Sequence, residues 1–203
     1  MLSEASVGER KLSQGAQATE RLDPTAAIVA TDAHGRYRES ARLGRLFNAS
    51  NQAAQAVSVA LTTTYTGLCI SNPAGNTKNA SMLGCYFALS VAPAAIASLH
   101  LIGGYSAAGI VTHTAALASP GIQSALLGGL NSTMKADTQA TIVNPGYVLP
   151  ICSGFTAAAL PSTSPGWIDL AGIIELVPGA WIAIGALTAV TGFGGFVWEE
   201  IDI

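Results

Sequence analysis

Charged residues are almost absent from the middle of this chain, and that distribution limits what it can fold into. Between residues 46 and 198 only five side chains are charged: Lys78, Lys135, Asp137, Asp169 and Glu175. The first 45 residues hold seven of the nine Lys and Arg residues and six of the twelve acids. A free soluble domain carries charge on about a quarter of its residues. We therefore expect the middle of the chain to be covered by copies of itself or by another protein.

The composition favours strands over helices. The apolar half of the chain is mostly small aliphatic residues, and 22 Gly and 9 Pro residues interrupt it. A helical bundle contains fewer such breakers and more Glu, Lys and Arg. The net charge of −3 does not indicate a nucleic-acid partner, because the acids of the first 45 residues offset its basic residues.

Short β-prone segments recur along the chain and are separated by turn residues. Residues 81–91 show the pattern most clearly, since Cys85, Phe87 and Leu89 fall on one face while Gly84 and Tyr86 fall on the other. Pro178-Gly179 separates two apolar segments, which predicts a β-hairpin. The predicted strands are residues 57–65, 66–71, 81–91, 96–102, 110–114, 139–143, 147–152, 170–177, 181–187 and 194–201. This spacing predicts an all-β sandwich or jelly roll.

The polar first part differs in composition from the rest. We predict an N-terminal arm over residues 1–51, extended or partly helical, and a jelly-roll β-sandwich over residues 52–203. A flexible tail is the alternative for the arm. An arm that orders on a partner is preferred, because Tyr37, Leu43, Leu46 and Phe47 give it apolar groups to bury.

Three segments together carry a family resemblance: residues 68–79 (LCISNPAGNTKN), 177–184 (VPGAWIAI) and 196–201 (FVWEEI). They resemble tailed-bacteriophage virion proteins of the jelly-roll type that decorate or cement capsids. The last two segments also look like the ending of trimeric jelly rolls of the tumour-necrosis-factor shape. The resemblance implies a homotrimer on the exterior of a phage capsid, bound to the major capsid protein and made in the host cytoplasm.

Two sets of residues are candidates for contacts in such an assembly. Arginine suits contacts with carboxylates because its planar fork binds them through paired hydrogen bonds, although simple solvation of these arginines is the alternative. The predicted capsid-binding residues of the arm are Arg36, Tyr37, Arg38, Arg42, Leu43, Arg45, Leu46 and Phe47. The predicted trimer-interface residues are His100, Trp181 and Trp198.

Catalytic and metal-binding patterns do not emerge from the sequence. It contains no G-x-S-x-G, Walker or H-E-x-x-H motif, and we expect neither an enzyme nor a cofactor or metal. Cys69, Cys85 and Cys152 form no C-x-x-C pair, so we expect reduced, buried thiols in an intracellular protein. Glu199 and Glu200 are expected on opposite faces of a solvated strand end.

Membrane insertion is not expected. The longest charge-free stretch, residues 79–134, is broken by Pro, His and Gly before it reaches the roughly 20 apolar residues that a spanning helix needs. The first residues contain no apolar segment typical of a secretory signal. The sequence therefore predicts a capsid decoration or cement protein. A head fibre or adsorption module that binds host surface glycans is the alternative, and an enzyme is the third.

Overall fold

The computed structural model describes residues 36–59, 61–108, 112–117, 121–155 and 166–203. The β-rich part forms one compact unit that begins at Glu39. Its elements in chain order are α1 (Arg38–Arg42), β1 (Leu46–Ser50), β2 (Gln55–Val57), β3 (Thr64–Ser71), β4 (Lys78–Leu89), β5 (Ala97–Tyr105), β6 (Thr112–Ala116), β7 (Gln123–Ser124), β8 (Lys135–Thr141), β9 (Gly146–Phe155), β10 (Ile168–Leu176), β11 (Ala180–Ala186) and β12 (Val190–Asp202).

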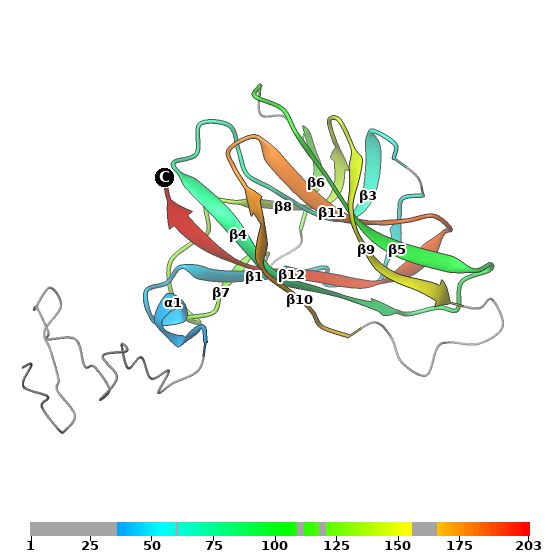
Figure 1. Ribbon diagram of the computed structural model, residues 1–203, viewed down its shortest axis with the longest axis horizontal. Helices are drawn as coiled ribbons and strands as arrows, with labels where there is room; N and C mark the ends of the chain where they lie inside the picture. Colours follow the sequence, from blue (N-terminus) through cyan, green and yellow to red (C-terminus); the bar gives the residue numbers. More distant parts are fainter. Residues whose placement is uncertain (1–35, 60, 109–111, 118–120, 156–165) are drawn as a thin grey trace, which may run out of the picture. The chain divides into compact units, whose positions relative to one another are not determined.

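The strands form two antiparallel sheets, and the chain is a jelly roll, as predicted (Figure 1). Sheet 1 has the order β10-β4-β12-β1-β7, with β2 also paired to β12. Sheet 2 has the order β6-β8-β3-β11-β5-β9. Eight of these strands pair in a nested way: β1 with β12, β3 with β11, β4 with β10, and β5 with β9. This nesting of first with last is the pattern of a rolled-up antiparallel hairpin, which defines the jelly roll.

Except for β5 and β9, which pair with each other in sheet 2, consecutive strands of the nested set belong to different sheets, and this corrects the predicted hairpin. β10 pairs with β4 in sheet 1, whereas β11 pairs with β3 and β5 in sheet 2. The Pro178-Gly179 turn exists, with Gly179 at φ 94°. It is anchored to the β3–β4 connection, because the Gly179 amide donates to the Asn72 carbonyl. The turn is therefore a corner between sheets.

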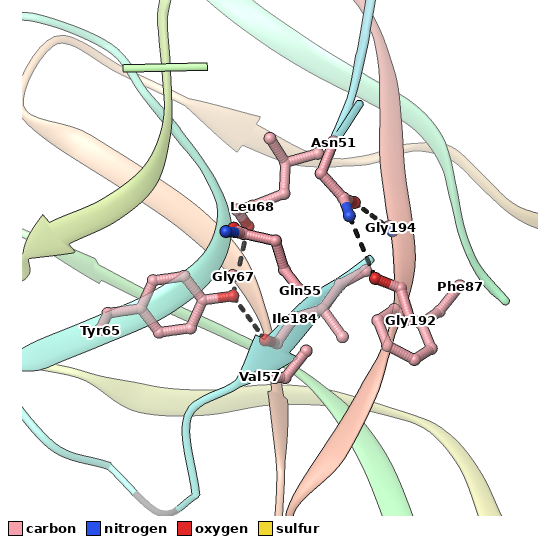
Figure 2. Close-up of a pocket in the computed structure, with 10 residues that line it drawn as sticks. All are labelled: Asn51, Gln55, Val57, Tyr65, Gly67, Leu68, Phe87, Ile184, Gly192 and Gly194. Atoms are coloured by element: carbon pink, nitrogen blue, oxygen red, sulfur yellow. Dashed lines mark hydrogen bonds between the residues drawn. The ribbon is translucent and has the colours of Figure 1, made fainter. Parts of the chain in front are cut away.

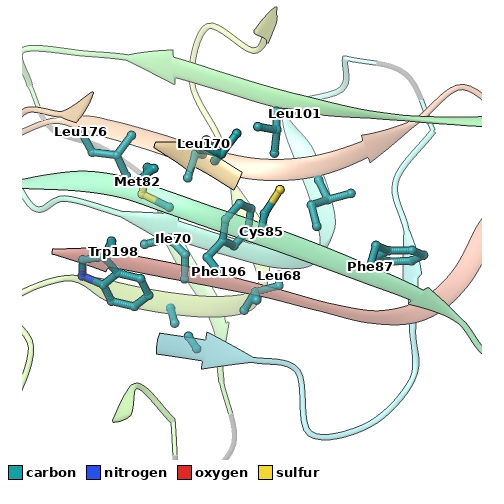
Figure 3. Packing of buried hydrophobic residues seen from close by; sticks show 14 of the residues in the cluster. Leu68, Ile70, Met82, Cys85, Phe87, Leu101, Leu170, Leu176, Phe196 and Trp198 are labelled. Carbon is teal, nitrogen blue, oxygen red and sulfur yellow. The ribbon is translucent and has the colours of Figure 1, made fainter. Parts of the chain in front are cut away.

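The core lies between the two sheets and is built from alternate positions of their strands (Figure 3). Cys85 and Phe87 of β4 face it, as the alternation predicted. Met82 also faces it, contrary to prediction, because the register between β4 and β12 shifts between Val197 and Trp198 and reverses the alternation on one side of the shift.

Strand β11 is buried on both faces because a second apolar cluster covers the outer side of sheet 2. Ile182 and Ile184 lie in the main core, whereas Trp181 and Ala183 belong to this second cluster. The other buried members of the second cluster are Tyr65, Cys69, Ile102, Ala140 and Ile142. A continuous apolar run such as residues 180–184 is typical of a strand covered on both sides.

Strand β1 places the start of the sandwich before the predicted boundary at residue 51. Residues Leu46–Ser50 pair with β12 along their whole length, so they belong to the sandwich. The prediction assigned these residues to the arm because residues 1–51 were treated as a single polar region. Residues 1–35 of the predicted arm lie outside the described residues.

Candidate functional site

Two of the three predicted trimer-interface residues are core residues of the single chain. Trp181 and Trp198 are 1% and 0% exposed. The Trp181 Nε1–H donates to the Val143 carbonyl at 2.9 Å, and the Trp198 ring stacks on Phe47 with a centroid distance of 6.3 Å. Their assignment to an interface between chains is therefore wrong: Trp198 lies in the main core, and Trp181 lies in the second cluster on the outer side of sheet 2.

His100 is the third predicted interface residue, and it lies half-buried on the outer side of sheet 2. Its Nε2 is 3.0 Å from the Ser98 hydroxyl, and its ring is tilted against Tyr147 with a centroid distance of 5.2 Å. Tyr147 is half-exposed. His100 therefore lies at the surface of the single chain, on the outer side of sheet 2.

The predicted capsid-binding residues of the arm separate into two groups. Leu46 and Phe47 are buried in the sandwich, so their assignment to a partner-binding arm is wrong. Leu43, Arg38, Arg42 and Arg45 are exposed. Arg36 lies over the ring of Tyr37, with its guanidinium carbon 5.1 Å from the ring centroid.

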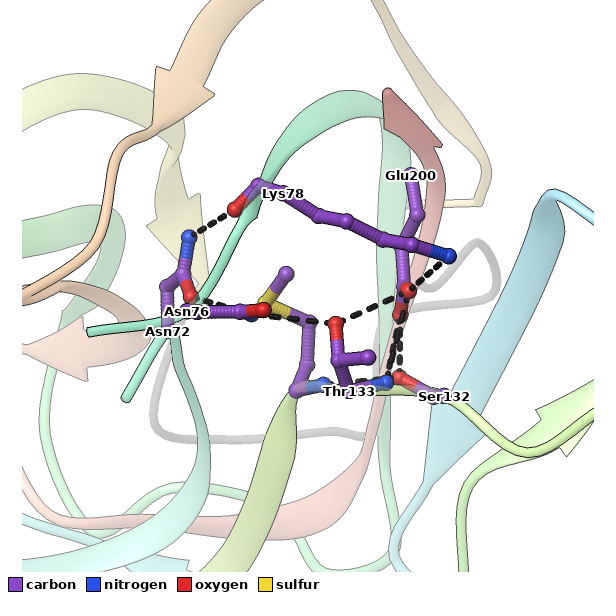
Figure 4. Close-up of polar contacts among 7 residues, drawn as sticks. Asn72, Asn76, Lys78, Ser132, Thr133 and Glu200 are labelled. Atoms are coloured by element: carbon purple, nitrogen blue, oxygen red, sulfur yellow. Dashed lines mark hydrogen bonds and ion pairs between the residues drawn. The ribbon is translucent and has the colours of Figure 1, made fainter. Parts of the chain in front are cut away.

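Glu200 is a buried structural carboxylate, which corrects the expected solvated strand end (Figure 4). It accepts hydrogen bonds from the Ser132 hydroxyl at 2.5 Å, the Thr133 hydroxyl at 3.0 Å and the Thr133 amide at 3.1 Å. Lys78 adds an ion pair, with its Nζ 3.7 Å from the carboxylate. These contacts hold the segment before β8 against the end of β12, so the role of Glu200 is structural.

A second buried carboxylate, Asp137, lies on β8 beside His113 of β6. The His113 Nδ1 is hydrogen-bonded to the Asp137 carboxylate, while Cys69 of β3 is its cross-strand neighbour. Burial raises the pKa of Asp137, and the hydrogen bond and charge of His113 oppose that shift. Burial, with the nearby Asp137 charge, also raises the pKa of the Cys69 thiol. Cys69 is therefore a protonated core thiol and a poor nucleophile.

A cavity lined by residues of β2, β3 and β12 is too small for a ligand (Figure 2). Its volume is about 10 Å³, close to that of one water molecule, whereas small-molecule sites span hundreds of Å³. Asn51 beside it donates to the Gly192 carbonyl and accepts from the Gly194 amide. The Tyr65 hydroxyl donates to the Ile184 carbonyl at 2.7 Å. The cavity is thus part of the structural core.

Two open hollows of about 230 and 330 Å³ flank the segment around β7. Leu127 and Leu130 line the larger one, and both remain strongly exposed. The smaller one includes Met134 and Lys135. These hollows lie beside β1, with which β7 pairs.

The outer face of sheet 1 carries two aromatic rings that lie close against glycines. A Cβ atom on Gly84 would be 2.1 Å from Cζ2 of Trp167, and one on Gly195 would be 2.1 Å from Cε1 of Tyr86. Only glycine therefore lets these rings lie directly on the strands. Gly84 and Tyr86 are two residues apart on the same face of β4, so both rings lie on the outer face of sheet 1. We call Trp167 and Tyr86 the aromatic platform.

Acidic side chains surround the aromatic platform. Glu175 of β10 and Glu199 of β12 are both cross-strand neighbours of Ser81, on either side of β4. Asp169 is the cross-strand neighbour of Gly84. The outward positions of β1, β4, β10 and β12, all of which the structure describes, include these three acids and no basic residue. The outward positions of Gly84 and Tyr86 were predicted, whereas Trp167 precedes its strand and no periodicity marked it.

Comparison with known proteins gives no relative: no family model, no curated protein and no solved structure matches the chain. Within the described residues, no helix is long and apolar enough to span a membrane. The same residues contain no group of three His, Cys, Asp or Glu side chains that could hold a metal ion. The aromatic platform with its acidic surround is the candidate functional site.

Proposed function

We propose that the chain is a structural virion protein that decorates or cements a tailed-bacteriophage capsid as a homotrimer and bridges major capsid protein subunits. The observation that carries the proposal is the surface of the sandwich, which exposes many apolar side chains and few charges. Ile96, Leu127 and Ile173 are 70%, 82% and 74% exposed. Asp137 and Glu200 are buried, so even some of the few charges do not reach water.

Such a surface favours association because burying apolar area stabilises a complex by about 25 cal/mol per Å² before ordering costs are subtracted. The jelly roll supports the proposal, since this fold is common among capsid proteins. Three copies would cover the exposed aliphatic side chains that a monomer leaves in water. The arm then supplies the contact with the shell, and the sandwich supplies the contacts between copies.

Light scattering coupled to size-exclusion chromatography tests the association. We expect a mass close to three times the 20.5 kDa chain. A monodisperse monomer across the accessible concentration range contradicts the proposal.

A deletion tests the arm. Removal of residues 1–45 leaves every strand of the sandwich in place and takes away the exposed capsid contacts predicted for the arm, so it should abolish binding to purified capsids. Deletion through residue 51 is unsuitable because it removes β1 and the core residue Phe47. Saturating capsid binding by the shortened chain contradicts the role of the arm. Glycan adsorption, the alternative function, is tested at the aromatic platform below.

A further inference from the structure

The aromatic platform has the chemistry of a guanidinium-binding surface. Guanidinium groups stack on aromatic faces and bind carboxylates through paired hydrogen bonds. The platform offers two rings, and Glu175 and Glu199 lie on the same face of the sheet. Within the described part of the chain, neither of these two acids forms an ion pair.

The chain itself contains the complementary group. Residues 36–45, which we call the arginine segment, hold four arginines and a single acid. Arg38 and Arg45 are exposed. The body is the opposite in sign: its outward face on sheet 1 has three acids and no base. Opposite charge on two separate patches of one chain favours contact between copies.

We propose that the aromatic platform and its acids bind the arginine segment of a second copy of this chain. Arg38 and Arg45 then pair with the carboxylates of Glu175 and Glu199 of a sister chain. The contact rests on the self-association proposed above and specifies its chemistry.

The proposed contact joins two different patches and is therefore heterologous. Heterologous contacts generate a ring when the rotation closes, and three of them close a ring with threefold symmetry. The contact is thus compatible with a trimer in which each chain gives its arginine segment to one neighbour and receives that of the other.

Trp167 gives a direct optical signal for this contact. The chain has three tryptophans, and Trp181 and Trp198 are buried within the single chain, whereas Trp167 is 52% exposed. Acrylamide quenching therefore reports chiefly on Trp167. On association we expect a blue shift of the emission and reduced quenching, both lost in Trp167→Phe.

A charge exchange between copies is the decisive experiment, performed on the full chain. The double variant Arg38→Glu/Arg45→Glu places acid against acid, and Glu175→Arg/Glu199→Arg places base against base. Each alone should weaken self-association at least about tenfold, because like charges face each other across the contact. A single chain that carries all four substitutions should restore the oligomer and the protected state of Trp167, since every arm then meets a face of opposite charge.

Three outcomes overturn the proposal. If both variants fold and associate like the parent chain, the oligomer uses another contact and the homotrimer proposal stands without this inference. If each variant is impaired but the chain with all four substitutions does not regain the oligomer, the two patches do not meet. If a glycan array gives specific binding that Trp167→Ala abolishes, and the charge variants associate normally, the platform is a sugar site. A monomeric parent chain contradicts the proposed function itself.

Discussion

Two glycines on the outer face of sheet 1 determine where aromatic rings lie. Gly84 and Gly195 have no side chain to hold Trp167 and Tyr86 away from the strands. Because the clash at Gly84 involves the far end of an exposed side chain, an added methyl group displaces that ring and leaves the core intact. The position of Trp167 can therefore be changed without changing the fold.

We predict that Gly84→Ala increases the acrylamide quenching of Trp167, because the indole ring is pushed from the sheet into water. The free energy of unfolding should change by less than about 1 kcal/mol, since strand alanines are tolerated and no core contact is lost. Gly166→Ala is the matched control, because a Cβ there meets no atom within 4 Å. Equal quenching in both variants would show that Gly84 does not position the ring.

Asp137 makes stability depend on pH. Burial raises its pKa in the folded chain, so the folded state holds this proton more tightly than the unfolded state does. The contribution of Asp137 to the free energy of unfolding therefore falls as the pH rises from the ordinary aspartate pKa of about 3.9 towards the raised pKa of Asp137. The partner His113 limits the loss by pairing with the carboxylate.

We predict that Asp137→Asn removes this contribution. In urea unfolding across the acid range, the stability of the parent chain relative to the variant should decline with increasing pH. Asp202→Asn, at an exposed position, is the control and should leave the pH profile of the parent chain unchanged. A constant difference between parent chain and Asp137→Asn would show that the carboxyl titrates alike in both states.

At the scale of elements, β12 has a different role on each of its two faces. Glu200 on its inner side holds the segment before β8, whereas Glu199 on its outer side belongs to the acidic surround of the platform. Adjacent carboxylates thus have separate roles because strand alternation sends them to opposite sides.

We predict that Glu200→Ala destabilises the chain by about 3 kcal/mol, because it leaves buried donors of Ser132 and Thr133 and the charge of Lys78 without their acceptor. Asp202→Ala, at the exposed end of the same strand, should cost less than about 0.5 kcal/mol. Denaturant midpoints measure both. Equal midpoints for the two variants would mean that Glu200 is replaceable by solvent.

Strand β1 supplies a second element-scale prediction. Phe47→Ala should lower the free energy of unfolding by about 3–5 kcal/mol, as expected for a fully buried ring that stacks on Trp198. Leu43→Ala, at an exposed position before the strand, is the control and should cost less than about 1 kcal/mol. If both cost little, β1 behaves as part of the arm.

Much of the fold could be predicted from the sequence, because alternation and turn residues are local signals. They indicated the strands around Cys85 and Phe87 and the turn at Gly179. They could not show that β10 and β11 enter different sheets, since a tight turn fits both a hairpin and a corner. Trp181 and Trp198 were misassigned for a related reason: a large aromatic suits a core and an interface equally well. The aromatic platform depends on cross-strand register, which no single segment encodes.

At the scale of the whole molecule, the scarcity of exposed charge links the fold to association. If copies cover the apolar surface, unfolding releases subunits, and mass action makes the melting temperature rise with protein concentration. We predict an increase measurable by scanning calorimetry over a hundredfold concentration range. The increase should shrink in Arg38→Glu/Arg45→Glu. A melting temperature independent of concentration would indicate that unfolding involves a single chain.

The nested strand order also bears on how the protein is made. β12 lies between β4 and β1 in sheet 1, although it is translated after both of them. At about 5–20 residues per second, several seconds pass between the synthesis of β1 and the synthesis of its partner β12. Sheet 1 can therefore form completely only after β12 has been translated. Until then, the unpaired edges of β1 and β4 in neighbouring nascent chains must not pair with each other.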